Sequence, residues 1–137
     1  MITGGEPLLY IEYLKRLITS INNIGHFQNN TPKIFIYISC CIWTKIYDLL
    51  KLRIDGIVLT PHTKSDIYDF VQTNSYLKSF ASYECKYRSL RLNLFPDMKA
   101  LLPKDIDLSL WKVKDMEWIE NCPVPEGEDF RRIAELW

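Results

Sequence analysis

The sequence predicts an α/β fold around a mainly parallel sheet of about five strands. The runs 33–39 and 56–60 are almost continuously apolar and rich in β-branched residues, which is typical of strands buried on both faces. Segments whose apolar residues recur at helical spacing separate these runs. Because strands that alternate with helices form βα units, the pattern favours a parallel sheet with helical crossovers.

The first elements are a short strand, a turn and a helix. Residues 2–3 form a β-branched stub, and the two glycines at 4–5 provide a turn. Over residues 7–24, apolar side chains recur every three or four positions, which predicts a helix with one apolar face. Pro7 suits the first helical position, where its missing N–H costs nothing, and Gly25 suits the C-terminal cap.

Helices and strands alternate along the rest of the chain. Helices are expected at 44–51, 63–72, 76–87 and 129–136, and strands at 33–39, 56–60, 90–94 and within 110–118. Thr63 and Asp66 have the spacing of a capping box, which marks the start of a helix. Leucines alternate with polar residues in 90–94, so this strand should have one solvent-exposed face. No repeat or linker is visible, and we expect residues 1–137 to form a single domain.

Composition excludes several classes of partner. The chain has 17 basic and 17 acidic residues, whereas a nucleic-acid binder normally shows a basic excess or stripe, so we expect no nucleic-acid partner. No apolar run reaches the roughly 18 to 20 residues needed to cross a bilayer. The first residues lack the basic and apolar regions of a secretory signal. We therefore expect no membrane association and a cytoplasmic location.

Polar side chains cluster where the predicted strands end, which is where parallel α/β folds carry out their chemistry. Those ends read Gly4-Gly5-Glu6, Ser39-Cys40-Cys41, Thr60-Pro61-His62 and Phe95-Pro96-Asp97. Ser39 and Thr60 could bind ribose hydroxyls or a carboxylate, and His62 could bind or protonate a substrate. The ordinary alternatives are that Ser39 caps the next helix and that His62 is a solvated loop residue. Asp97 is expected to cap the turn after Pro96.

The cysteines do not predict a metal site. Neighbouring residues on a strand point to opposite faces, so Cys40 and Cys41 cannot easily bind one metal ion. A zinc site built from Cys40, Cys85, Cys122 and His62 is possible in principle, but no pair has the spacing of a zinc motif. Free thiols that pack as small hydrophobic side chains are the favoured interpretation.

The segment TGGEPLL near the N-terminus resembles the radical S-adenosylmethionine (radical SAM) superfamily. In that superfamily a GGEP motif holds the amino group of the methionyl moiety of S-adenosylmethionine (SAM). The resemblance implies a partial (β/α)6 barrel, of which this chain would cover roughly the second to sixth units. The residues that we then expect to bind the cofactor are Gly4, Gly5, Glu6, Pro7, Ser39, Thr60 and His62.

Two parts of the family pattern are missing. A CxxxCxxC loop, which binds a [4Fe-4S] cluster, lies one βα unit before GGEP in the family, and no spacing among these four cysteines matches it. The chain therefore resembles a core that lacks its first βα unit. The adenine-contacting G-x-I-x-G-x-x-E pattern also has no match, because residues 91–97 read RLNLFPD at that place.

Two classes of function remain open. In a radical SAM enzyme, an electron from the cluster would cleave SAM reductively to methionine and a 5′-deoxyadenosyl radical, and we expect this chain alone to be inactive because the cluster cysteines are missing. Alternatively, the chain is a cluster-free remnant that binds a nucleotide-like ligand or a protein partner. A partner chain could pair with a sheet edge beside residues 1–3, and residues 118–130 could cover the barrel mouth or form a docking edge.

Overall fold

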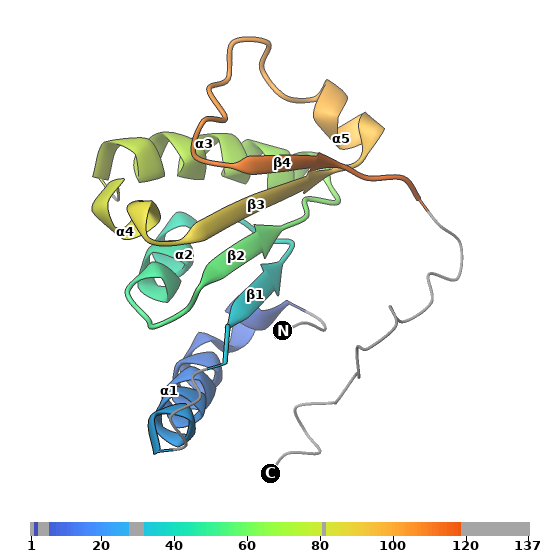
Figure 1. Ribbon diagram of the computed structural model, residues 1–137. Helices are drawn as coiled ribbons and strands as arrows, with labels where there is room; N and C mark the ends of the chain where they lie inside the picture. The colour runs from blue at the N-terminus through green and yellow to red at the C-terminus, as the bar shows by residue number, and fades with distance from the viewer. Residues whose placement is uncertain (1, 3–5, 28–31, 81, 119–137) are drawn as a thin grey trace.

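A four-stranded sheet forms the centre of the fold in the computed structural model, which describes residues 2, 6–27, 32–80 and 82–118 (Figure 1). The strands are β1 Phe35–Ile38, β2 Gly56–Leu59, β3 Ser89–Leu94 and β4 Lys112–Asp115. Neighbouring strands are all parallel, and their spatial order β1-β2-β3-β4 is also their order in the chain. The predicted α/β class and parallel sheet are confirmed.

Ile2 adds a single parallel bridge beside β1, opposite Ile36. The amide of Ile2 donates to the carbonyl of Phe35 at 3.0 Å, and the amide of Tyr37 donates to the carbonyl of Ile2 at 2.9 Å. The stub predicted at residues 2–3 thus lies in line with the sheet at Ile2, while Thr3 lies outside the described residues. About five strands were expected, and among the described residues the fifth is represented by Ile2 alone.

Helices follow the strands in alternation. They are η1 Pro7–Tyr10, a 3-10 helix, and α1 Ile11–Phe27, α2 Trp43–Leu50, α3 Lys64–Phe80, α4 Ser82–Lys86 and α5 Pro96–Ala100. The prediction that Gly25 ends the first helix is wrong, because α1 continues past it to Phe27. The predicted break after residue 72 is also wrong, since α3 continues to Phe80 and α4 covers most of the rest of 76–87. The helix expected at 129–136 lies outside the described residues.

The start of α3 confirms the predicted capping box. The amide of Asp66 donates to Thr63 Oγ1 at 3.2 Å, and the amide of Thr63 donates to Asp66 Oδ2 at 2.8 Å. The amide of His62 donates to the same carboxylate oxygen at 3.0 Å. These bonds satisfy amides that a helix leaves without partners in its first turn. They also fix the loop that carries His62 at the end of β2.

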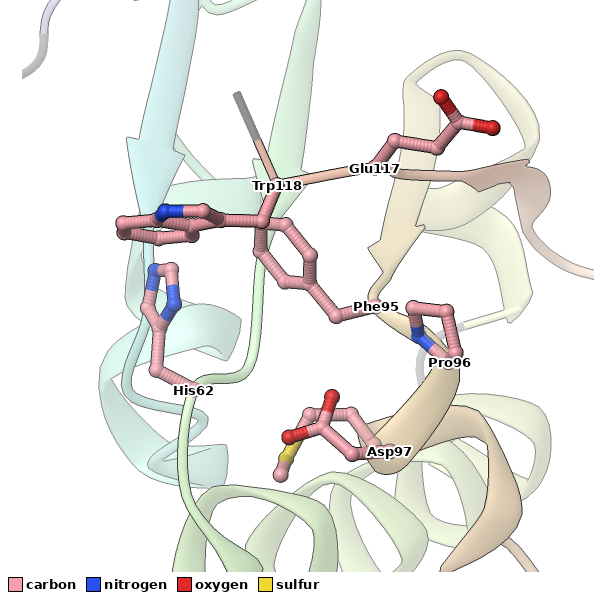
Figure 2. A pocket seen from close by; sticks show the side chains of 7 residues that line it. His62, Phe95, Pro96, Asp97, Glu117 and Trp118 are labelled. Atoms are coloured by element: carbon pink, nitrogen blue, oxygen red, sulfur yellow. The ribbon is translucent and has the colours of Figure 1, made fainter. Parts of the chain in front are cut away.

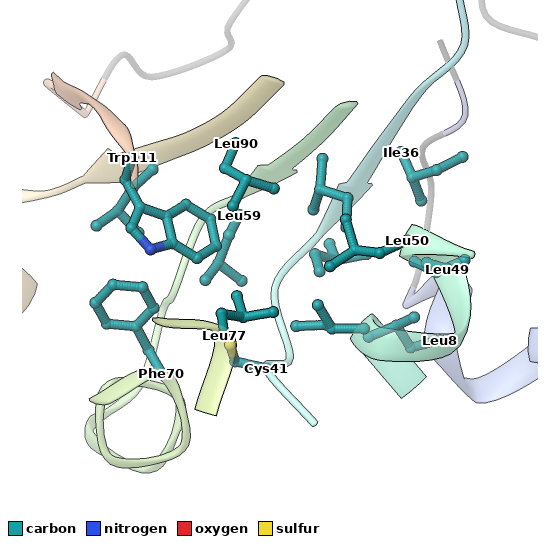
Figure 3. Close-up of a cluster of buried hydrophobic side chains, with 14 of the residues drawn as sticks. Leu8, Ile36, Cys41, Leu49, Leu50, Leu59, Phe70, Leu77, Leu90 and Trp111 are labelled. Atoms are coloured by element: carbon teal, nitrogen blue, oxygen red, sulfur yellow. The ribbon is translucent and has the colours of Figure 1, made fainter. Parts of the chain in front are cut away.

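One face of the sheet is buried under the helices. Alternate strand residues, among them Ile36, Leu59 and Leu90, pack in one core with Leu49 and Phe70 from the helices (Figure 3). The alternation follows from the two-residue period of a strand. It confirms the prediction that the strand at 90–94 has one buried and one solvent-exposed face. Among the described helices, none is both long and apolar enough to span a membrane.

The other face, which we call the open face, is not covered by the described helices. By register it comprises Phe35, Tyr37, Gly56, Val58, Ser89, Arg91, Asn93, Lys112 and Lys114. The prediction that both faces are buried is confirmed for β2. It is wrong for β1, where Phe35 and Tyr37 remain half-buried, because the helices pack on the opposite face.

Candidate functional site

The carboxyl ends of the strands place most of the predicted site residues along one edge of the sheet. Ser39 follows β1, Thr60 and His62 follow β2, and Phe95 follows β3. Since all strands are parallel, these loops leave the sheet at the same edge. Gly4 and Gly5 lie outside the described residues, but Ile2 and Glu6 on either side of them are described.

Glu6 is anchored to the end of β1 by its carboxylate. Its Oε2 accepts hydrogen bonds from the Ser39 amide at 2.8 Å, the Ser39 hydroxyl at 2.7 Å and the Cys40 amide at 2.8 Å. Its Oε1 accepts one from the Leu8 amide at 3.1 Å, which caps the first turn of η1. A carboxylate that accepts several amide bonds is a strong, charge-assisted clamp. Ser39 therefore positions Glu6 and does not cap α2, whose N-cap is Ile42.

The two oxygens of Glu6 are not equally engaged. Oε2 receives three hydrogen bonds, whereas Oε1 receives one. Each carboxylate oxygen offers about two acceptor directions, so Oε1 can accept one further donor. Lys45 donates to the carbonyl of Leu8 at 2.8 Å, which holds η1 against α2. Pro7 is buried at the first position of η1, where it shapes the turn.

Thr60 is joined to β3 by Asn93. The Asn93 side-chain amide donates to Thr60 Oγ1 at 3.2 Å, so the Thr60 hydroxyl acts as the acceptor in this contact. The hydroxyl proton of Thr60 is then available for another acceptor at the same edge. Asn93 was not among the predicted site residues. The signal that could have identified it is its place on the polar side of the strand at 90–94.

His62 belongs to a groove of about 490 Å3 at the same edge (Figure 2). Its ring centroid lies 5.9 Å from that of Phe95, and the Phe95 and Trp118 centroids are 6.0 Å apart. The residues that line the groove are His62, Phe95, Pro96, Asp97, Met98, Glu117 and Trp118. An aromatic lining with a few polar groups is typical of small-molecule sites. Trp118 is not among the residues predicted to bind the cofactor, although it begins the segment 118–130 that the sequence suggested as a cover for the barrel mouth.

Asp97 lies in the first turn of α5, where Phe95 is the N-cap and makes no side-chain cap. The expected capping role of Asp97 is therefore wrong, since the helix starts one residue earlier, at Pro96. The exposed carboxylate of Asp97 faces the groove, whereas the carboxylate of Glu117, another lining residue, points away from it (Figure 2). Negative charge thus lies on the side of the groove opposite His62.

The cysteines are divided between core and edge. Cys41 and Cys85 are buried, and burial raises the pKa of the Cys41 thiol to about 12 and that of Cys85 to about 11. Both thiols remain protonated at neutral pH, which agrees with the interpretation that they pack as small hydrophobic side chains. Burial, and then the negative charge of Glu6, raise the pKa of the half-buried Cys40. Cys122 lies outside the described residues.

The described residues bring no three His, Cys, Asp or Glu side chains together in an arrangement that could hold a metal ion. Comparisons with family models, with curated proteins and with solved structures each return no match to this chain. The radical SAM relationship therefore remains a prediction from the GGEP motif and its position in the fold.

Proposed function

We propose that the carboxyl edge of the sheet binds SAM, and that this chain contributes the SAM-binding part of a radical SAM-type protein. One observation carries the proposal. Ile2 lies in line with the sheet beside β1, and Glu6 is fastened to the end of that strand four residues later. The described residues on either side of Gly4 and Gly5 therefore lie in line with the sheet and at its carboxyl edge, which supports a ligand-binding role for this motif.

Glu6 supplies the group that would meet the methionyl end of SAM. Its carboxylate is held by three donors on Oε2, so the side chain cannot swing away from the edge. Oε1 accepts only the Leu8 amide and retains room for a donor such as an ammonium group. A preorganised carboxylate binds a cation at a lower entropic cost than a mobile one.

The remaining edge residues suit the nucleoside end of SAM. The Thr60 hydroxyl can donate to a ribose oxygen, because its oxygen is already engaged by Asn93. His62, Phe95 and Trp118 offer aromatic faces on which an adenine ring can stack. The groove that they line measures about 490 Å3, within the usual range of small-molecule sites.

The topology supports the finer expectation of a partial (β/α)6 barrel. The strands follow one another in chain order, and the core places the helices on one face. This singly wound arrangement is that of a barrel segment, whereas a doubly wound sheet reverses its strand order at a switch point. In such a segment the open face would be the barrel interior.

The described residues do not fit a [4Fe-4S] cluster. Cys41 and Cys85 point into the core as protonated thiols, and no three potential ligands meet. Reductive cleavage of SAM would require a cluster bound by other residues. The part assigned to this chain is therefore the binding and orientation of SAM, through Glu6 and Thr60.

A second candidate function is favoured by the state of Glu6. Four donors of the chain itself already satisfy most of the capacity of this carboxylate. If Glu6 only holds the start of η1 against the end of β1, the aromatic groove could bind a nucleoside, and the site would not recognise a methionyl group. The chain would then be a cluster-free binder of a nucleotide-like ligand.

Calorimetric titrations of the full chain with SAM and with adenosine test both candidates. We expect SAM to bind more tightly than adenosine, because adenosine lacks the ammonium group that Glu6 would hold. Thr60→Val and Glu6→Gln should each weaken SAM binding by about tenfold, roughly the effect of losing one hydrogen bond to a charged or ligand group. Thr44→Val, an exposed position on α2, is the matched control and should leave the affinity unchanged.

Each outcome favours one candidate. Equal affinities for SAM and adenosine, with Glu6→Gln unchanged, would exclude the methionyl site and support the nucleoside site. Absence of heat with either ligand would contradict both. Circular dichroism of Glu6→Gln is needed beside the titration, since Glu6 also holds the N-terminal segment in place.

A further inference from the structure

Six cationic side chains gather on the open face and in the groove at the amino ends of its strands. They are Lys33, Lys86, Arg88, Arg91, Lys112 and Lys114. The groove measures about 430 Å3. None of the six forms an ion pair with an acidic side chain in the part of the chain that the structure describes. Asp55 is the one acidic residue among those that line the groove, and its carboxylate accepts a hydrogen bond from the Ile34 amide. Among the described residues, this face therefore carries an excess of positive charge.

The opposite charge lies in the residues from 119 to 137, which we call the C-terminal segment. Of the 17 basic and 17 acidic residues of the chain, this segment contains 2 basic and 5 acidic ones. Its net charge is therefore −3, and that of residues 1–118 is +3. The acidic residues are Glu120, Glu126, Glu128, Asp129 and Glu135. The zero net charge of the chain is thus the sum of a positive charge on residues 1–118 and an equal negative charge on the C-terminal segment.

The open face also offers apolar area. Phe35 and Tyr37 are half-buried, so part of each ring remains accessible, whereas Val58, which pairs with Tyr37 in the sheet, is only 3% exposed. Parallel sheets are almost always covered on both faces. The C-terminal segment carries Phe130 and Ile133 at helical spacing, within the helix predicted at 129–136. It therefore offers apolar residues together with its negative charge.

The C-terminal segment begins at the carboxyl edge of the sheet, because Trp118 lies there. After β4 the chain turns back across the carboxyl edge, and Trp118 lies at a tilt against Phe95, beside His62 in the groove after β2 (Figure 2). The helix-covered face is already filled by the core. An extended chain advances about 3.3 Å per residue, so the segment is long enough to cross the sheet from edge to edge.

We propose that the C-terminal segment docks on the open face of its own chain. Its acidic residues would lie against Arg91, Lys112 and Lys114, and its apolar residues against Phe35 and Tyr37. This arrangement would cover the second face of the sheet and neutralise its charge. The inference does not depend on the proposed SAM site, because Trp118 is the one residue that the two share and the docking contacts lie on the open face.

Carbodiimide cross-linking of the full chain tests the proposal directly. The reagent joins a carboxylate to an amine only where the two groups are in contact. We expect cross-links within one chain between Lys112 or Lys114 and Glu126, Glu128 or Asp129, identified by mass spectrometry after proteolysis. Lys64 and Lys104 are also exposed but lie outside the open face, and they serve as the matched controls.

Three outcomes would overturn the inference. The first is the absence of cross-links between the C-terminal segment and the open face. The second is an equal yield at Lys64 and Lys104, which would indicate non-specific contact. The third is a set of cross-links confined to a dimer and dependent on concentration, which would assign the contact to a second copy of the chain.

Hydrogen exchange gives an independent readout without a chemical reagent. Lys112→Glu combined with Lys114→Glu should accelerate amide exchange in residues 119–137 by about three- to tenfold, because several surface ion pairs are lost or reversed. Lys64→Glu combined with Lys104→Glu changes the net charge equally and should leave that exchange unchanged. Equal exchange in the two double variants would contradict the docking. Circular dichroism confirms that both remain folded.

Discussion

Gly56 shows how a single residue sets the spacing of the sheet. A Cβ atom at this position would lie 2.3 Å from the carbonyl oxygen of Ser89 and 2.8 Å from Cε1 of Phe35. The ring of Phe35 therefore lies where a side chain of residue 56 would be. The guanidinium carbon of Arg91 stacks 4.6 Å from the centroid of the same ring. The absence of a side chain at Gly56 thus permits an aromatic and cationic contact across β2.

Gly56→Ala should destabilise the protein by about 1–3 kcal/mol, the usual cost of overpacking a well-packed site. The cost is difficult to avoid because the nearer of the two contacts is a backbone atom, which cannot rotate away. Urea denaturation of both proteins gives the two free energies of unfolding. Ser75→Ala, at an exposed position on α3, is the control and should change stability by less than about 0.5 kcal/mol. A similar small effect at Gly56 would show that the strands can move apart.

At the scale of elements, α3 holds the loop between α5 and β4 in place. The Trp111 indole donates to Asn74 Oδ1 at 2.9 Å, and the Asn74 amide donates to the carbonyl of Asp107 at 3.0 Å. Lys78, one turn further along α3, bonds the Asp107 carboxylate and holds the pKa of Asp107 well below its usual range. A buried polar pair thus positions the loop that leads into β4.

Asn74→Ala should cost about 1–3 kcal/mol, because it leaves the buried indole N–H of Trp111 without a partner. Chemical denaturation measures this change in the free energy of unfolding. Trp111→Phe removes the same hydrogen bond from the other side, although it also reduces packing against Phe70. In a double-mutant cycle the two changes should cost less together than the sum of the single costs. Strict additivity would show that the hydrogen bond contributes nothing.

At the scale of the whole molecule, buried thiols should limit stability at alkaline pH. Burial raises the pKa of Cys41 from its ordinary 9.0 to about 12. Between these values the unfolded chain releases the proton and the folded chain retains it, so stability is complete below pH 9 and falls as the pH rises. The free energy of unfolding should fall by up to about 1.4 kcal/mol per pH unit from this thiol.

Denaturation under reducing conditions at several pH values between 9 and 11 measures that slope. Cys41→Ala removes the thiol and should make the slope of the free energy of unfolding against pH shallower by nearly 1.4 kcal/mol per pH unit, the effect of one proton. This difference in slope is separate from any loss of stability at neutral pH. Other groups also titrate in this range, so the difference between the two slopes is the quantity that tests the prediction. Identical slopes would mean that Cys41 ionises in the folded protein as easily as in the unfolded one.

The sequence was sufficient to predict the fold class, because its signals are local. The apolar run at 56–60, the alternation at 90–94 and the Thr63–Asp66 spacing each depend on neighbouring residues. The end of α1 was predicted wrongly, because a glycine such as Gly25 can also lie inside a helix. The half-buried state of β1 was not predicted either, since large aromatic residues suit a partly exposed face as well as a buried one.

The candidate site was predictable only in part. Because parallel strands have their carboxyl ends at one edge of the sheet, Ser39, Thr60 and His62 could be predicted to lie along the same edge. It could not show that Ser39 binds Glu6, that Asn93 binds Thr60 or that Trp118 reaches His62, because each contact joins residues far apart in the sequence. Such contacts depend on side-chain geometry across strands, which periodicity does not contain.

The chain-order arrangement of the strands also bears on how the protein is made. Each strand pairs with the one synthesised just before it, so its partner is already outside the ribosome when it emerges. At about 5–20 residues per second, successive βα units are produced within a few seconds of each other. None of the described strands has to wait for a distant segment before it can pair, which shortens the time that apolar strand edges remain exposed. The sheet can therefore grow in one direction during translation, from Ile2 toward β4.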